Sequence, residues 1–224
     1  MLTQSKLIAP KNAPVSTQTK EQPKATKFDY QPATKLANSR PWPFLYGRKS
    51  IIQKLPIDKD AKVTILEIGC GTGKNLKYIA KKFPQAQLYG IDESPEMTQK
   101  AQKNVEAYQD RVEIIQAPYQ EGLDYPFEQV DGIVFSYALG KLDKNWEDLL
   151  NRAWEDLKPG GWVAVVDFHN SGFGAFKKRM ENRLIKLDGH LLRFLRDHFL
   201  IHLESVKSAY AGAWSYFLFV GKKL

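Results

Sequence analysis

The sequence has little cysteine and no long apolar run. Cys70 is the only cysteine among 224 residues, so an internal disulfide framework is excluded and a reducing, cytoplasmic setting fits. No apolar stretch approaches the roughly 20 residues of a membrane-spanning helix. Residues 1–14 lack the continuous apolar core of a secretory signal, so we expect none there. A hydrophobic content of 43% and a charged content of 26% are instead typical of a globular domain.

The net charge of +8 is unevenly distributed along the chain. Residues 1–62 carry 12 Lys/Arg and 4 Asp/Glu, residues 63–170 carry 11 and 17, and residues 171–224 carry 10 and 4. An acidic middle between basic flanks argues against a uniform nucleic-acid-binding surface. It fits a basic rim that faces an anionic substrate or membrane, although ordinary solvated lysines explain the charge of residues 1–39 equally simply.

Composition divides the chain into a tail and one domain. Residues 1–39 are rich in Lys, Gln, Thr, Pro and Ala and show no helical or strand period, which predicts a disordered basic tail. Residues 40–224 form the predicted domain. Within residues 40–60, the aromatic side chains Trp42, Phe44 and Tyr46 are unusual for a spacer. They predict an N-terminal cover that docks on the domain.

From residue 62 onward, strand patterns alternate with helix patterns. Predicted strands cover residues 63–68, 88–92, 112–117, 130–136 and 162–168, and two final antiparallel strands cover residues 200–206 and 214–220. Predicted helices cover residues 72–82, a segment opening at Ser94-Pro95, residues 146–157, and one or two amphipathic helices within residues 173–198. This alternation predicts an α/β fold with a mostly parallel sheet and helices on both faces.

A glycine-rich loop, EIGCGTG at residues 67–73, ends the first strand and opens the first helix. Gly69 and Gly71 permit unusual backbone angles and let a ligand approach the main chain. Asp92 ends the second strand, where a carboxylate can bind two ribose hydroxyls. The order GxGxG differs from the GxGxxG of dinucleotide sites. Glu67 disfavours a phosphate and suits the cationic sulfonium and amino groups of S-adenosylmethionine. The alternative interpretation of the loop is a tight strand–helix turn that binds no ligand.

Three segments, LEIGCGTG, GIDESPEM and LKPGG, resemble the class I S-adenosylmethionine-dependent methyltransferases over about residues 60–170. The resemblance implies a Rossmann-like, seven-stranded sheet of order 3-2-1-4-5-7-6, with strand 7 antiparallel. It implies S-adenosylmethionine as the cofactor, with Glu67, Gly69 and Gly71 lining its methionine part. Asp92 would hold the ribose and Met97 would pack near the adenine.

The sequence departs from the family after the third strand. Members often place an Asp there to bind the adenine amino group, but Gln116 is followed by Ala117 and Pro118. Gln116 or a backbone carbonyl must then take that role, or the contact is absent. The predicted cofactor-binding set also includes Cys70, Ser136, Tyr46 and Arg48. The Arg48 guanidinium suits the cofactor carboxylate, although binding a helix end or a surface acid is equally plausible.

The segment after the fourth strand narrows the choice of acceptor. FSYAL replaces the Asn/Asp-Pro-Pro-aromatic loop typical of enzymes that methylate nucleic-acid bases, and no carboxylate cluster suggests a metal. FLYGRKSII, VFSYAL and VVDFHN resemble the betaine-lipid type of N-methyltransferase. The expected acceptor is therefore a small-molecule or lipid-headgroup amine. Two alternatives are C- or O-methylation of a quinone-like metabolite and a nucleic-acid-binding protein that uses the basic flanks.

Two candidate catalytic residues, Tyr137 and His169, lie just beyond the fourth and fifth strands, where ligands of such sheets bind. Either can accept a proton or orient the acceptor nitrogen, and Asp167 is a further candidate that could instead cap a turn. Apolar residues recur every three or four positions within residues 173–198, between basic ones. This pattern suits peripheral contact with an anionic membrane, but it also suits a helix that covers the sheet.

Overall fold

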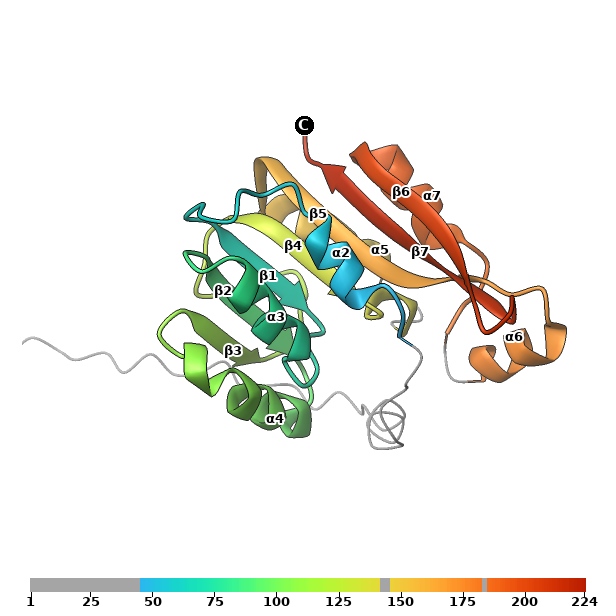
Figure 1. Cartoon of the computed structure of the whole chain (residues 1–224), viewed down its shortest axis with the longest axis horizontal. Coiled ribbons are helices and arrows are strands. Elements are labelled where there is room, and N and C mark those ends of the chain that lie inside the picture. The colour runs from blue at the N-terminus through green and yellow to red at the C-terminus, as the bar shows by residue number, and fades with distance from the viewer. Residues whose placement is uncertain (1–44, 142–145, 183–184) are drawn as a thin grey trace, which may run out of the picture.

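The computed structural model describes residues 45–141, 146–182 and 185–224 (Figure 1). The predicted tail and the first part of the predicted cover, with Trp42 and Phe44, lie outside the described residues. The described strands form one seven-stranded sheet of order β3-β2-β1-β4-β5-β7-β6. This is the order that the family resemblance implied, so the predicted fold is confirmed.

The sheet is parallel from β1 to β5, and β7 runs antiparallel between β5 and β6. The strands are β1 (Thr64–Ile68), β2 (Gln87–Asp92), β3 (Val112–Gln116), β4 (Val130–Ser136), β5 (Leu157–Asn170), β6 (Leu200–Ala209) and β7 (Trp214–Lys222). Because β1, β2 and β4 are neighbours, their carboxyl ends meet at one edge of the sheet. This edge carries the glycine loop.

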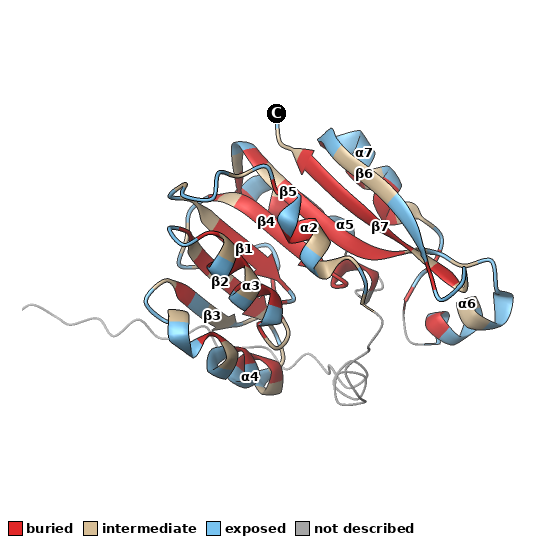
Figure 2. Ribbon diagram, viewed as in Figure 1, coloured by how far each residue is buried: buried red, intermediate tan, exposed pale blue. Residues whose placement is uncertain are grey.

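Helices cover both faces of the sheet (Figure 1). They are α2 (Arg48–Gln53), α3 (Lys74–Lys82), α4 (Pro95–Val105), α5 (Trp146–Asp156), α6 (Gly174–Glu181) and α7 (His190–His198), with short 3-10 turns η1 (Glu106–Tyr108) and η2 (Leu139–Lys141). Figure 2 shows that β1, β4, β5 and β7 are buried along most of their length, whereas the edge strand β6 is largely exposed. One core lies under α2, α3 and α4, and the other lies under α5 and α7.

The cover of the first core is α2, whose Ile51 and Ile52 are completely buried. It packs against β5, β7 and α3. Gly47 precedes it with φ 81°, and an added Cβ at Gly47 would lie 2.8 Å from the Tyr216 ring. The backbone at Gly47 therefore packs directly against side chains of β5 and β7.

Several element bounds differ from the predictions for local reasons. Helix α3 begins at Lys74 rather than at residue 72, because Gly73 adopts a left-handed conformation. Strand β5 begins at Leu157, which pairs with Val130 across a register shift, so LKPGG belongs to an irregular start of the strand rather than being only a helix stop. Residues 173–198 contain two separate helices, and Gly189, with φ 74°, precedes the second.

The apolar stripe of residues 173–198 faces inward in the described residues. Met180, Leu187, Leu191 and Leu195 are at most 2% exposed. Of the two interpretations offered by the sequence, the structure supports a helical segment that covers the sheet. Within the described ranges, no helix is both long and apolar enough to cross a membrane.

Candidate active site

The glycine loop is fixed at its base and open at its tip. The backbone nitrogens of Gly69 and Cys70 both donate to the carbonyl of Ile91, over 2.9 and 3.0 Å, so the loop is anchored to β2. Gly69 and Gly71 have φ of 69° and 54°, which disfavour side chains. An added Cβ at Gly69 would lie 2.8 Å from the Ala138 Cβ, whereas one at Gly71 would meet no atom within 4 Å. Gly71 therefore faces open space.

Asp92 ties this loop to the start of α4. Its Oδ2 accepts a hydrogen bond from the Gly71 nitrogen over 2.8 Å, and its Oδ1 accepts one from the Ser94 nitrogen over 3.0 Å. Ser94 in turn caps α4, as the sequence predicted, by accepting from the Met97 nitrogen over 3.4 Å. Met97 is buried in the first turn of that helix. Asp92 thus lies between the glycine loop and the start of α4, next to the open space at Gly71.

Glu67 is an almost fully buried carboxyl on β1. Its Oε1 accepts a hydrogen bond from the Asn75 side chain over 2.7 Å, while its Oε2 is buried and has no hydrogen-bond partner in the structure. Burial raises the pKa of Glu67 to about 7, against the opposing effects of the Asn75 hydrogen bond and the Arg48 charge. Sequence reasoning missed Asn75. A polar side chain in the first turn after the glycine loop was the available signal.

Arg48 approaches this carboxyl from the cover. It is the first residue of α2, and its Nε is buried without a hydrogen-bond partner. Its positive charge lowers the pKa of Glu67 and also that of Tyr137, so it acts on both sides of the glycine loop. Arg48 Nε and Glu67 Oε2 are both buried and do not bond to each other. Each still has an unsatisfied polar atom, which a buried group normally avoids.

Tyr137 follows β4 in a strained conformation, with φ 55°. Its hydroxyl donates a hydrogen bond to the Tyr46 carbonyl over 2.8 Å. Burial and the nearby Asp167 charge raise the pKa of Tyr137, so the hydroxyl remains protonated. This arrangement anchors the cover and makes Tyr137 a poor proton acceptor. Ser136, one residue earlier, is buried and its Oγ has no hydrogen-bond partner.

Asp167 and His169 lie on the same face of β5 but have different surroundings. Asp167 is completely buried and accepts a hydrogen bond from the Gly140 nitrogen over 3.0 Å, so it holds the turn after β4. The His169 ring lies beside Gly189, and its Nδ1 is buried without a partner. Burial, followed by the Arg196 charge, lowers the pKa of His169. His169 therefore faces α7 and β6, not the Arg48–Glu67 pair.

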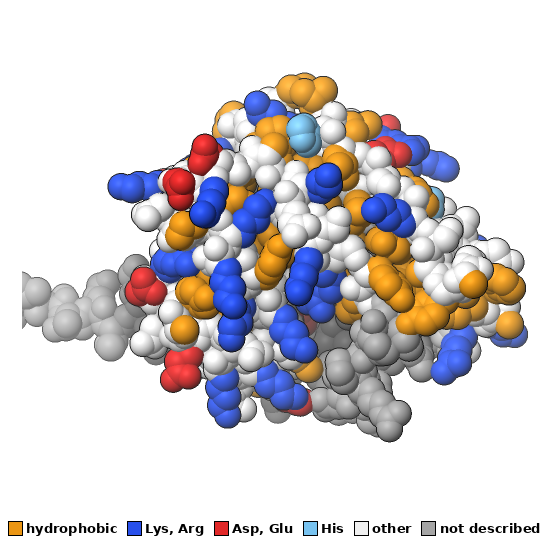
Figure 3. Space-filling view, viewed as in Figure 1, with side chains coloured by type: hydrophobic (Ala, Val, Ile, Leu, Met, Phe, Trp, Pro, Cys, Tyr) orange, Lys and Arg blue, Asp and Glu red, His pale blue; other side chains and the backbone are white. Residues whose placement is uncertain are grey.

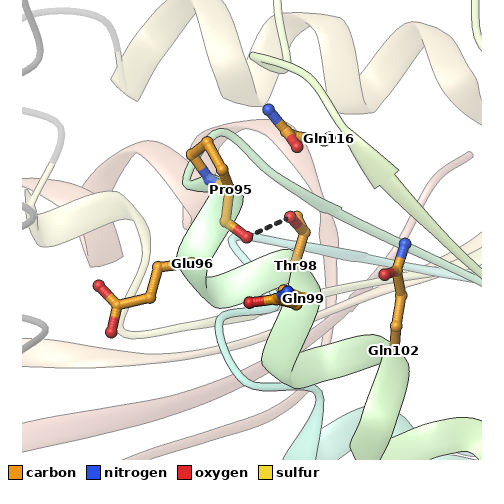
Figure 4. A pocket seen from close by; sticks show the side chains of 6 residues that line it. All are labelled: Pro95, Glu96, Thr98, Gln99, Gln102 and Gln116. Carbon is orange, nitrogen blue, oxygen red and sulfur yellow. Dashed lines mark hydrogen bonds between the residues drawn. The ribbon is translucent and has the colours of Figure 1, made fainter.

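Two predicted cofactor residues have distinct environments. Gln116 ends β3 beside Asp92 and, with Pro95, Glu96, Thr98, Gln99 and Gln102, lines a hollow of about 400 Å³ (Figure 4). The Pro118 carbonyl accepts a hydrogen bond from the Tyr125 hydroxyl over 2.7 Å, whereas the Gln116 side chain lines the hollow and is a candidate for an adenine contact. Cys70 is buried beside Gly90 of β2, and burial raises the pKa of its thiol. Its side chain therefore packs inside the domain.

The described residues contain no cluster of three or more His, Cys, Asp or Glu side chains arranged to hold a metal ion. Residues 65–161 match the family model for a methyltransferase domain. This stretch is a methyltransferase domain. It includes the glycine loop, Asp92, Gln116 and Tyr137, while Arg48 and His169 lie outside it.

Curated relatives match half of the chain or somewhat more. Malonyl-[acyl-carrier protein] O-methyltransferase of Priestia megaterium is 31% identical over 50% of this chain and 39% of its own length. Trans-aconitate 2-methyltransferase of Azoarcus sp. is 28% identical over 62% of this chain and 49% of its own length. The chain thus spans about half the length of the curated relatives it matches or less.

Among solved structures, the N-methyltransferase NodS of Bradyrhizobium japonicum, in complex with S-adenosylhomocysteine, has a similar fold. The TM-score is 0.67 at 19% identity, and the match covers 85% of this chain and 95% of NodS. The methyltransferase domain therefore lies in a chain with the class I methyltransferase fold, and the fold extends beyond residue 161 through β6 and β7.

Proposed function

We propose that this protein is an S-adenosylmethionine-dependent methyltransferase whose acceptor is an amine of a small molecule or lipid headgroup. One observation carries the cofactor assignment. Glu67 Oε2 and Arg48 Nε are buried, oppositely charged and unpartnered, beside a glycine loop that is open at Gly71. The amino-acid end of the cofactor carries an ammonium and a carboxylate, which complement these two groups.

The other cofactor roles are assigned by position. Asp92 accepts one backbone hydrogen bond on each oxygen, and each oxygen retains a lone pair for a ribose hydroxyl. Gln116 is placed to bind the adenine amino group, and Met97 to pack against the ring. When bound, the cofactor supplies an activated methyl group on a cationic sulfonium. Ser136 and Tyr46, and Cys70 through its backbone, contribute to the walls of the site rather than to charge recognition.

The acceptor assignment rests on the groups near the carboxyl ends of β4 and β5. The Tyr137 hydroxyl already donates to the cover, and the lowered pKa of His169 keeps its ring neutral near pH 7. Tyr137 is therefore a poor base, and neutral His169, which lies beside Gly189, is the candidate base of the two. An unprotonated amine attacks with little assistance and does not depend on such a base. Ser136 Oγ can orient the amine, and neutral His169 can take up the released proton. The resemblance of three segments to the betaine-lipid type of N-methyltransferase supports a headgroup amine and, with it, peripheral membrane contact.

O-methylation is the second candidate, because the Priestia megaterium relative is an O-methyltransferase by name. A carboxylate acceptor would also need no base, since it is already ionised at neutral pH. The two candidates differ in the pH dependence of the rate. When S-adenosylmethionine is saturating at every pH, an amine acceptor reacts faster as pH rises toward the amine pKa, whereas a carboxylate acceptor shows no such increase.

The decisive experiment has two stages. Calorimetry measures S-adenosylhomocysteine binding to the wild type and to Arg48→Met, with Lys49→Met as the matched control from the same helix. Binding that weakens about tenfold or more in Arg48→Met alone supports the cofactor site. Transfer of labelled methyl from S-adenosylmethionine is then measured with aliphatic amines, dicarboxylic acids and quinones. Absence of S-adenosylhomocysteine binding to the wild type contradicts the proposal.

A further inference from the structure

Four aromatic side chains from two distant parts of the chain gather next to Tyr137. We call this group the aromatic wall, and it consists of Tyr46, Tyr210, Trp214 and Tyr216. The Tyr46 ring stacks on Tyr216 at a centroid distance of 6.0 Å and meets Tyr210 edge-on at 5.8 Å. The Trp214 ring lies 6.4 Å from Tyr46 and 5.9 Å from Tyr216. Contacts between aromatic rings thus connect the cover to the β6–β7 hairpin.

Half of the wall is exposed. Trp214 and Tyr216 are 3% and 8% exposed and form its base, whereas Tyr46 and Tyr210 are 44% and 43% exposed. Phe173, 58% exposed, lies two residues beyond Ser171, which hydrogen-bonds the Ala213 carbonyl beside Trp214. Figure 3 shows hydrophobic side chains gathered over the end of the molecule where this hairpin and α6 lie. Among the described residues, the wall therefore offers apolar surface that no other side chain covers.

The wall is continuous with the candidate active site. The Tyr137 hydroxyl bonds the Tyr46 carbonyl, and the Tyr137 ring lies 4.9 Å from the Phe168 ring. Phe168 in turn lies 5.1 Å from Trp214. Tyr137, Phe168 and Trp214 are all buried, so these contacts join the wall to the residues after β4 through the core, and the exposed rings of Tyr46 and Tyr210 lie above that buried link.

The hairpin tip that presents Tyr210 is strained. Tyr210 and Ala211 have φ of 51° and 52°, and the Gly212 nitrogen donates to the Ala209 carbonyl over 3.1 Å. Gly212 also has a positive φ, of 90°, so three consecutive residues of this turn adopt a conformation that favours glycine or asparagine. A tyrosine at this position is disfavoured by its backbone, and such strain is common at sites that hold a ligand.

We propose that the aromatic wall binds a hydrocarbon portion of the methyl acceptor, adjacent to its reacting nitrogen. This inference rests on the proposed function and deepens it, because it makes the acceptor an amphiphilic amine with an alkyl or acyl chain. The four wall residues include no carboxylate and no cationic group, so they suit uncharged hydrocarbon. Aromatic faces gain free energy by removing such chains from water in proportion to the area buried.

The test uses n-alkylamines as probes, from butylamine to decylamine, with calorimetry on the full chain in the presence and absence of S-adenosylhomocysteine. Wild-type affinity is expected to rise roughly two- to fourfold for each added methylene. Tyr210→Gly removes the ring and relieves the strain, so the protein stays folded while the dependence on chain length flattens. Ala211→Gly is the matched control, because it relieves strain at the next residue and leaves the wall intact. Tyr210→Phe keeps the ring and should keep the dependence.

The outcomes separate this inference from the proposed function. If S-adenosylhomocysteine does not bind, the proposed function fails, yet alkylamine binding that depends on chain length and on Tyr210 still supports the wall. If S-adenosylhomocysteine binds but affinity is independent of chain length, or Tyr210→Gly behaves like Ala211→Gly, the inference is overturned. It is also overturned if Tyr210→Gly weakens binding only to anionic phosphatidylglycerol vesicles, since the wall would then be a membrane contact.

Discussion

The hydroxyl of Tyr137 donates a hydrogen bond to the backbone carbonyl of Tyr46, across 91 positions of sequence and 2.8 Å of space. This bond connects the turn after β4 to the residue that precedes Gly47 and α2. Arg48 begins that helix, so the position of its guanidinium beside Glu67 depends on how this segment is held. The bond therefore links the acceptor side of the candidate site to its cofactor side.

Tyr137→Phe should loosen this link without removing a ring from the core. We expect the free energy of unfolding to fall by about 1 kcal/mol, the usual net value of one hydrogen bond. S-adenosylhomocysteine affinity should fall severalfold as Arg48 becomes less well placed. Denaturant unfolding and calorimetry measure the two effects. Unchanged affinity at reduced stability would mean that the bond only supports the fold.

Gly71→Ala separates backbone strain from ligand access. The change forces a side chain onto φ 54° and should destabilise the protein by about 1–2 kcal/mol, but it creates no clash. Gly122→Ala is the matched control, since Gly122 also has positive φ and open surroundings. Both variants should lose similar stability, while only Gly71→Ala should weaken S-adenosylhomocysteine binding, by about tenfold or more. If both variants bind S-adenosylhomocysteine equally well, Gly71 does not contact the cofactor.

Asp92→Asn tests the ribose contact. The variant keeps the shape of the side chain and can still accept one backbone hydrogen bond, but it loses the charge that strengthens the bond to a hydroxyl. We expect S-adenosylhomocysteine affinity to fall about 10- to 100-fold. Glu93→Gln removes the neighbouring, exposed carboxylate as a control and should change little. A similar loss in both variants would point to a general effect of charge.

The raised pKa of Glu67 predicts how stability depends on pH. A carboxyl whose folded pKa is about 7, above its value of 4.5 in the unfolded chain, binds its proton more tightly when folded. Its contribution to stability is therefore fully present below about pH 4.5 and is lost as pH rises through about 7, by up to ~3 kcal/mol. Glu67→Gln should abolish this part of the pH dependence in denaturant unfolding. Glu113→Gln, at an exposed site on β3, should not.

The same group predicts how cofactor binding depends on pH. The ammonium of the cofactor prefers ionised Glu67, and the ionised fraction rises from about one tenth at pH 6 to about nine tenths at pH 8. S-adenosylhomocysteine affinity should therefore increase up to about tenfold over this range in the wild type. Calorimetry on Glu67→Gln should show weak binding with little pH dependence. An affinity that falls between pH 6 and pH 8 would rule out Glu67 as the ammonium partner.

Much of the fold and of the cofactor loop could be predicted from local sequence. The apolar runs of β1 and β4, the cap at Ser94-Pro95 and the glycines at 69 and 71 each act through nearby residues, so their meaning is visible in a short segment. The position of Asp92 at the end of β2 is visible in the same alternation of strands and helices. Asn75 was missed because its hydrogen bond to Glu67 depends on how α3 leaves the loop.

Other features depended on contacts between distant segments. The sequence alone determined the alternation of strands and helices and the carboxylates that flank the loop, because strand patterning and glycine conformation are local properties. The sheet order came only from the family resemblance. Only the tertiary structure placed Arg48 near Glu67, turned His169 toward α7 and β6, and joined Tyr46 to the hairpin of Tyr210. Those relationships depend on how α2 packs on the sheet and where the β6–β7 hairpin lies at its edge. Contacts between residues so far apart in the sequence produce no periodic pattern from which they could be predicted.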